Sequence, residues 1–140
     1  MQEAQPTLLH VCRIPLRWAD MDAKAHVNNV QYMRLLEQSR IEWMGNTVDH
    51  PEWGDGVSLV SVHQSCDFRL ETVYPAEVEV RLYLVKLGRS SVTLHQDIRT
   101  VGDERVRAEG TAVLVFTQAS GGSIPIPEAA RLLFQPRVTA

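Results

Sequence analysis

The chain has 140 residues, of which 44% are hydrophobic and 22% charged, and its formal net charge is −3. These values predict one globular domain over residues 1–140, and the acidic balance argues against a general nucleic-acid binder, which needs a basic surface for phosphates. Neither a membrane span of roughly 18 apolar residues nor a signal peptide is evident, so we expect a cytoplasmic protein without a membrane partner.

The first expected element is a strand. Apolar residues alternate along residues 8–18, which is the period of a strand with one buried face. Pro15 falls within this run. Because proline has no N–H to donate to a neighbouring strand, we expect this strand to lie at a sheet edge or to carry a bulge.

A long helix is expected over residues 29–45. The residues that recur at helical spacing are Tyr32, Leu36, Ser39 and Trp43. Asn28 or Asn29 is a good N-cap, and Gly45 or Asn46 is a plausible end.

Four segments with strand periodicity follow the helix, at residues 60–70, 78–84, 92–98 and 106–116. In the first of them we expect Val60 and Val62 on the apolar face and His63 on the polar one. A short terminal helix is expected from Pro127 to Phe134. A strand, one long helix and four alternating strands predict an α+β fold, with the helix lying across an antiparallel sheet.

The two cysteines, Cys12 and Cys66, are too few for a disulfide framework and match no zinc motif. We expect both to be reduced and mostly buried.

Polar residues gather just before the long helix, in "RWADMDAKAHVNN" at residues 17–29. A helix N-terminus offers unpaired N–H groups and a partial positive charge, which stabilise an anion such as the oxyanion of acyl transfer. Asp22 is the candidate to attack a carbonyl or to activate a water, and His26 to orient substrate or share protons. The residues alone leave two other interpretations open. The cluster can be ordinary helix capping, or Asp20, Asp22 and His26 can hold a metal, although their spacing matches no zinc motif.

The segment "RWADMDAKAHVNNVQYMRLLEQSRIEW" resembles the signature of hotdog-fold acyl-CoA thioesterases of the 4-hydroxybenzoyl-CoA thioesterase family. In that family an Asp, three variable residues, HVNN and a Tyr lead into the central helix. Later segments, "VYPAEVEVRLYLVKLGRSSVTLHQDI" and "IPIPEAARLLF", are also similar, so nearly the whole chain is covered. The resemblance implies a hotdog fold, in which a curved antiparallel sheet of about five strands wraps a long central helix.

The resemblance also implies a hydrolase that cleaves an acyl-CoA thioester. Asp22 is then the catalytic carboxylate, as nucleophile or general base, His26 and Asn28 support it, and no metal or other cofactor is needed. Hotdog proteins usually pair their sheets edge to edge and place sites at the subunit interface, so we expect a homodimer or homotetramer. Alternatives are a thioesterase acting on acyl carrier protein, or an acyl-CoA-binding protein without catalysis.

A basic turn, KLGRSS, resembles the family's segment near the coenzyme A nucleotide. The residues expected to bind its phosphates are Lys86, Arg89, Ser90 and Ser91. A solvated turn with ordinary surface charge explains the same sequence.

Ala25 departs from the family pattern, in which many relatives have Gly before the histidine. An alanine there would strain the loop if the position required a positive φ.

Glu37 is a second candidate acid, because some hotdog thioesterases use an acid on the helix. His63 and Asp67 are expected to be solvated residues on a sheet face.

Overall fold

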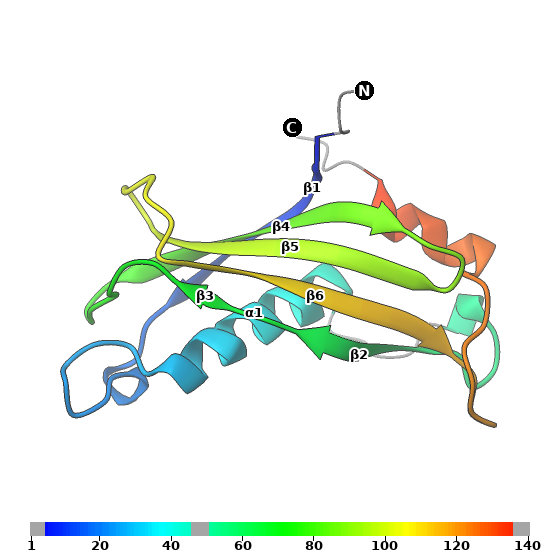
Figure 1. The fold of residues 1–140 in the computed structure, drawn as a ribbon, viewed down its shortest axis with the longest axis horizontal. Helices are drawn as coiled ribbons and strands as arrows, with labels where there is room; N and C mark the ends of the chain where they lie inside the picture. The colour runs from blue at the N-terminus through cyan, green and yellow to red at the C-terminus, as the bar shows by residue number, and fades with distance from the viewer. Residues whose placement is uncertain (1–4, 46–50, 136–140) are drawn as a thin grey trace.

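The computed structural model describes residues 5–45 and 51–135. One antiparallel sheet of six strands dominates it (Figure 1). The strands are β1 (Thr7–Pro15), β2 (Ser58–Gln64), β3 (Asp67–Phe68), β4 (Glu77–Leu87), β5 (Ser91–Thr100) and β6 (Ala108–Thr117). Their order is β1-β4-β5-β6-β2, and β3 also pairs with β6.

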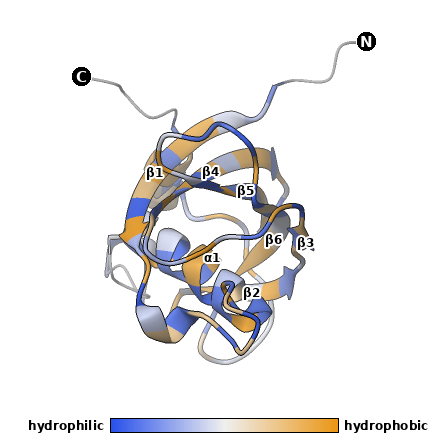
Figure 2. Cartoon of the chain, turned by 90° about the vertical axis from the view of Figure 1, so that its left-hand side faces the viewer, coloured by the Kyte–Doolittle hydropathy of each residue, from blue (hydrophilic) through white to orange (hydrophobic). Residues whose placement is uncertain are grey.

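The helix α1 (Asn29–Trp43) lies across one face of this sheet and packs on β1 and β4. Figure 2 shows the sheet curving around it. The core residues alternate along the strands as expected, with Val78, Val80, Leu82, Val92 and Leu94 fully buried. The expected α+β arrangement, a central helix wrapped by a curved sheet, is confirmed.

Strand β1 bears out the inference from Pro15. It is the outer strand of the sheet, paired only with β4 in the sheet order, and its register shifts between Leu8 and His10. The edge position is what makes Pro15 tolerable, because the register shift lies at the other end of the strand and the ladder from His10 to Pro15 is regular.

The expected strand over residues 60–70 is wrong in two respects. It is split into β2 and β3, and Val60 and Val62 are 39% and 60% exposed, whereas Leu59 is buried. Leu59 and Val60 are both apolar, so the alternation alone did not decide which of them faces the core. A register shift between Ser61 and His63 then interrupts the period.

Helix α1 begins as expected. The Asn28 side chain accepts a hydrogen bond from the Val30 N–H at 3.1 Å, which is the N-cap contact. The chain leaves the helix at Gly45, whose φ of 81° suits glycine; Asn46 lies outside the described residues.

The described part of the chain also contains three short 3₁₀ helices: η1 (Trp18–Asp20), η2 (Pro51–Trp53) and η3 (Glu128–Phe134). The last is the expected terminal helix, and its Leu133 carbonyl accepts a hydrogen bond from the Trp43 indole at 3.1 Å. Cys12 and Cys66 are free thiols, as expected. Within the described ranges, the structure contains no helix with the length and apolar character to cross a membrane.

Candidate active site

The loop between β1 and α1 is anchored by a buried carboxylate, Asp20. Its side chain is fully buried and accepts hydrogen bonds from the Arg17 backbone and guanidinium, at 2.7 to 3.1 Å. The Arg34 guanidinium of α1 reaches the same carboxylate at 3.1 Å. Burial acts to raise the pKa of Asp20, but these hydrogen bonds and charges outweigh it and hold the pKa below its ordinary value. Asp20 is thus a structural residue, and the idea that it ligates a metal loses its support.

Asp22 has the opposite environment. Met21 and Val27 pair as a short bridge, and residues 22–26 form the tip of the resulting hairpin. The tip is closed by hydrogen bonds from the Asp22 N–H to the His26 carbonyl and from the Ala25 N–H to the Asp22 carbonyl, both at 3.0 Å. The Asp22 carboxylate is exposed and accepts only the Lys24 N–H at 2.9 Å among the described residues. It is therefore held in place locally, with most of its accepting capacity free.

Ala25 has a φ of 61°, and it is the only residue other than glycine with positive φ in the described part of the chain. The Gly of the family pattern is explained by this backbone conformation. Alanine adopts it at a cost, because its Cβ crowds the following carbonyl.

A surface hollow of about 420 Å³ lies beside this tip. It is lined by Trp18, Met21, Asp22, Ala23 and Ala25. The Trp18 side chain is 72% exposed, an unusual state for a residue of this size. An apolar wall next to a free carboxylate is suited to an acyl group whose carbonyl must meet that acid.

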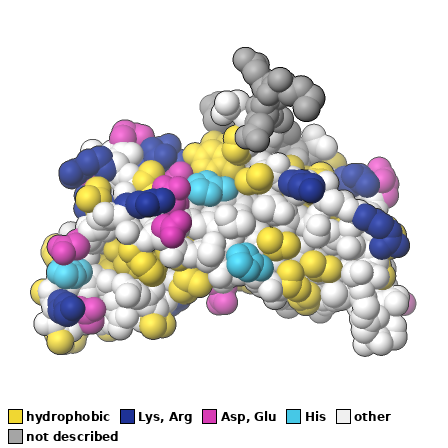
Figure 3. All heavy atoms as spheres, in the orientation of Figure 1, with side chains coloured by type: hydrophobic (Ala, Val, Ile, Leu, Met, Phe, Trp, Pro, Cys, Tyr) yellow, Lys and Arg dark blue, Asp and Glu magenta, His cyan; other side chains and the backbone are white. Residues whose placement is uncertain are grey.

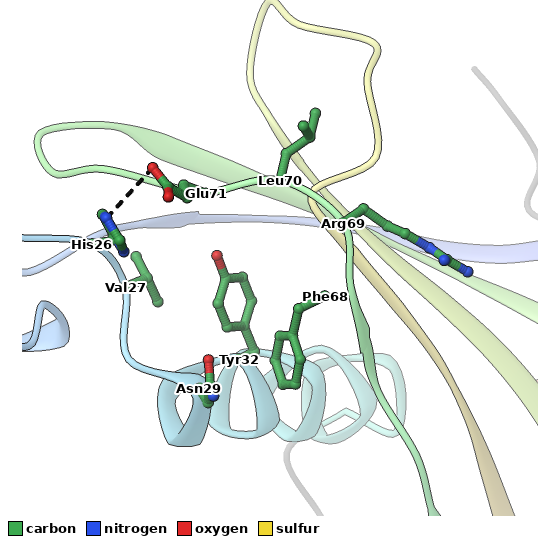
Figure 4. Close-up of a pocket in the computed structure, with 8 residues that line it drawn as sticks. All are labelled: His26, Val27, Asn29, Tyr32, Phe68, Arg69, Leu70 and Glu71. Atoms are coloured by element: carbon green, nitrogen blue, oxygen red, sulfur yellow. Dashed lines mark ion pairs between the residues drawn. The ribbon is translucent and has the colours of Figure 1, made fainter. Parts of the chain in front are cut away.

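His26 faces a second pocket, of about 180 Å³, between the loop and the segment around β3 (Figure 4). Its Nε2 lies 3.4 Å from the Glu71 carboxylate. Tyr32 and Phe68 form another wall of this pocket and meet edge to face, and the Tyr32 hydroxyl donates to Thr72 at 3.0 Å.

Glu71 and Thr72 were missed by sequence reasoning. They lie some 45 and 40 positions from their partners, in an irregular segment without a periodic pattern. The one available signal was Tyr32, which belongs to the quoted family pattern and has a hydroxyl that needs a partner when buried.

The start of α1 has fewer available donors than a bare helix end. The Val30 and Gln31 N–H groups already donate to the side chain and carbonyl of Asn28. Among the described residues, none accepts a hydrogen bond from the Asn29 N–H. Asn28 thus shapes the helix start through capping, and Asn29, an exposed residue, is the first residue of the helix.

The basic turn lies far from this loop within one chain. Pro15, just before the loop, pairs with Glu77 at the start of β4, whereas Lys86 and Leu87 end that strand. Ten residues of strand separate these ends by roughly 33 Å, and Figure 1 shows the loop and the turn at opposite ends of the sheet. Lys86 and Arg89 are exposed, and Ser90 and Ser91 are half-buried.

The other candidate residues also lie apart from Asp22. Glu37 is exposed and lines a separate hollow of about 130 Å³ with Arg40, Leu59 and Leu114. Eight residues of helix, roughly 12 Å, separate it from Asn29. His63 and Asp67 are exposed, as expected.

Comparisons with known proteins agree with the fold. The model of the thioesterase-like superfamily matches residues 16–134, so the chain belongs to that superfamily. The comparison with curated proteins found no significant match.

Solved structures include the PA2801 protein of Pseudomonas aeruginosa, named as a candidate thioesterase, at 35% identity and a TM-score of 0.81, covering 91% of this chain and 99% of that one. A candidate acyl-CoA thioesterase from Xanthomonas campestris is 32% identical with a TM-score of 0.71, covering 83% and 98%. A 1,4-dihydroxy-2-naphthoyl-CoA thioesterase from Synechocystis shares the fold at 15% identity and a TM-score of 0.79, covering 89% and 93%. The hotdog fold is confirmed, and the activity class is thioester hydrolysis.

Proposed function

We propose that the protein is an acyl-CoA thioesterase in which Asp22 is the catalytic carboxylate. The observation that carries this proposal is the exposed Asp22 side chain, fixed at a hairpin tip beside an apolar hollow. Two reaction routes can use this carboxylate. Asp22 takes a proton from a water that attacks the thioester carbonyl, or it attacks the carbonyl itself to form an anhydride that water then cleaves. In both, the C–S bond breaks and coenzyme A leaves as a thiolate that takes up a proton.

The developing oxyanion needs donors, and the Asn29 N–H at the start of α1 is our candidate. The positive end of the helix dipole adds to its effect. His26, whose ring is held near Glu71, is assigned to positioning the acyl group, and Asn28 to fixing the helix start.

We further propose that two chains pair through β2. This strand is the outer strand opposite β1, and its valines at positions 60 and 62 are exposed. An open edge of this kind invites pairing with another strand. A two-fold axis through such a pair makes the two β2 strands antiparallel. The Asp22 loop of one chain then comes to the same end of the dimer as the Lys86–Ser91 turn of the other, which supplies cations and hydroxyls for the nucleotide.

The first test is thiol release from short, medium, long and aromatic acyl-CoAs, measured with a thiol-reactive dye. We expect turnover of at least one class, and a fall in kcat of about 10²-fold or more in Asp22→Asn, the order expected for a lost catalytic group. Asp67→Asn, an exposed acid of the same type, is the matched control and should leave kcat unchanged. Full activity in Asp22→Asn would transfer the role to another acid, with Glu37 next in line.

Mixed dimers test the shared site. Chains carrying Asp22→Asn are mixed with chains carrying both Lys86→Ala and Arg89→Ala, and the mixture is unfolded and refolded together. A site built from two chains gives one intact site per heterodimer, so part of the activity should return with the KM of the wild type. If each site is built within one chain, every site in the heterodimer keeps the defect of its own chain. The recovered activity with the KM of the wild type should then not appear.

A further inference from the structure

Three side chains that the proposed reaction does not use meet between the edge strand β1 and the last turn of α1. His10 and Cys12 are two positions apart on β1, so they point to the same face of the strand. Glu42 comes from the helix. Its two carboxylate oxygens lie 2.7 Å from the Cys12 sulfur and 3.2 Å from the His10 Nε2.

This cluster is independent of the Asp22 loop. Thirteen residues of α1, roughly 20 Å, separate Asn29 from Glu42. None of its three residues lines the hollow at Asp22 or the pocket at His26.

The donor set is that of a transition-metal site. A thiol, an imidazole and a carboxylate are the three side-chain types that bind Zn²⁺, whereas Mg²⁺ and Ca²⁺ take oxygen ligands. One ligand atom from each of the three residues lies within 4.8 Å of the other two. Ligand atoms around a tetrahedral zinc ion lie roughly 3.3 to 3.7 Å apart. The Cys12–Glu42 contact therefore has to lengthen, and any ligand pair as far apart as 4.8 Å has to close, each by about 1 Å.

The environment supports the same conclusion. Cys12 is buried, while the Glu42 side chain is 44% exposed and has room to turn.

We propose that His10, Cys12 and Glu42 form a zinc-binding site. On binding, the Cys12 S–H bond breaks, a sulfur–zinc bond forms, and the proton passes to solvent. Three protein ligands leave the fourth position of the tetrahedron to water. The metal links the edge strand to the end of the helix, so we expect its binding to stabilise the packing of these two elements.

Cobalt is the probe for the test, because Co²⁺ takes zinc sites and its absorption reports thiolate ligation. The full chain, freed of metal with a chelator, is titrated with Co²⁺ and then with Zn²⁺. We expect one equivalent of Co²⁺ to produce a thiolate-to-cobalt absorption band, which Zn²⁺ abolishes, and we expect Zn²⁺ to raise Tm by several degrees.

Two variants keep the result interpretable. Cys12→Ser should lose the band, while Cys66→Ser, the other free thiol, should keep it. Glu42→Gln changes an exposed side chain with little risk to folding, and it should weaken Co²⁺ binding at least 10-fold and abolish the Tm increase. The proposal is overturned if the wild type shows no thiolate band, if the band survives in Cys12→Ser, or if Glu42→Gln binds as tightly as the wild type.

Discussion

The loop before α1 carries two carboxylates, two residues apart, in opposite environments. Asp20 is fully buried and is held by Arg17 and Arg34, whereas Asp22 is exposed at a hairpin tip and keeps most of its oxygen lone pairs free. The first half belongs to the core of the fold, and the second half presents a group to the outside. A site of this type needs both, because an exposed acid can be positioned only if the chain on either side of it is fixed.

The sheet's outer face gives a further contrast. Charged side chains gather there near the β5–β6 turn (Figure 3). Their acids are already matched: Arg81 contacts Glu79 at 2.7 Å, and Arg99 contacts Asp97 at 3.1 Å and Glu104 at 2.9 Å. Asp22 forms no ion pair within the described residues, which distinguishes it from these paired acids.

The largest effect on stability is expected for Asp20→Asn. The change places an amide N–H₂ among the donors of Arg17 and Arg34 and removes the charge that compensates them. We expect a loss of about 3 kcal/mol of unfolding free energy, measured by urea denaturation. Asp67→Asn, whose side chain is 74% exposed, should change this value by less than about 0.5 kcal/mol. Asp22→Asn should be as stable as the wild type. An equal loss of stability in Asp20→Asn and Asp22→Asn would contradict the assignment of a structural role to Asp20 alone.

The same carboxylate predicts an acid dependence. Although burial opposes it, the net effect of Arg17 and Arg34 is a pKa of Asp20 below its ordinary value. A lowered folded-state pKa means that Asp20 contributes its stability above about pH 4, the ordinary value, and loses it as the pH falls further. Urea midpoints between pH 7 and pH 3 should therefore fall less steeply in Asp20→Asn than in the wild type. Parallel curves would contradict the assignment.

A smaller effect is expected at the distant turn. Replacing both Lys86 and Arg89 by alanine removes two cations, and we expect KM for acyl-CoA to rise about 10-fold, or 1.4 kcal/mol, with kcat nearly unchanged. Acyl-pantetheine, which lacks the nucleotide, should be hydrolysed equally by both proteins. Arg13→Ala, at an exposed cation on β1, is the control and should leave both values unchanged. An unchanged KM in the double variant would favour acyl carrier protein as the natural acyl donor.

The smallest effect is expected at the hairpin tip. Glycine adopts the positive φ of residue 25 without crowding, at the cost of greater freedom in the unfolded chain. We expect Ala25→Gly to gain about 0.5 kcal/mol and to raise Tm by about 2 °C. Ala23→Gly, on the same tip without a positive φ, should lower stability instead. A loss in Ala25→Gly would show that the tip is not strained.

Much of this arrangement could be predicted from local pattern. Helix α1 and its Asn28 cap, the edge position of β1 and the core faces of β4 to β6 follow from periodicity, capping chemistry and the properties of proline. The inward face of β2 did not follow, because Leu59 and Val60 are both apolar and a register shift interrupts the strand. Pairs such as His26 with Glu71, or Arg40 with Gln96 at 2.9 Å, depend on chain topology and leave no local trace. The environment of Asp20 likewise depends on Arg34, which lies six residues beyond the Asn28 cap.

The separation of loop and turn along β4 has a kinetic consequence. Because the acid and the nucleotide turn come from different chains in the proposed dimer, a single chain contributes only part of the contacts to its substrate. Specific activity should then fall on dilution below the dimer dissociation constant, and the total rate there should scale with the square of the chain concentration. The abundance of the protein would itself control whether hydrolysis takes place.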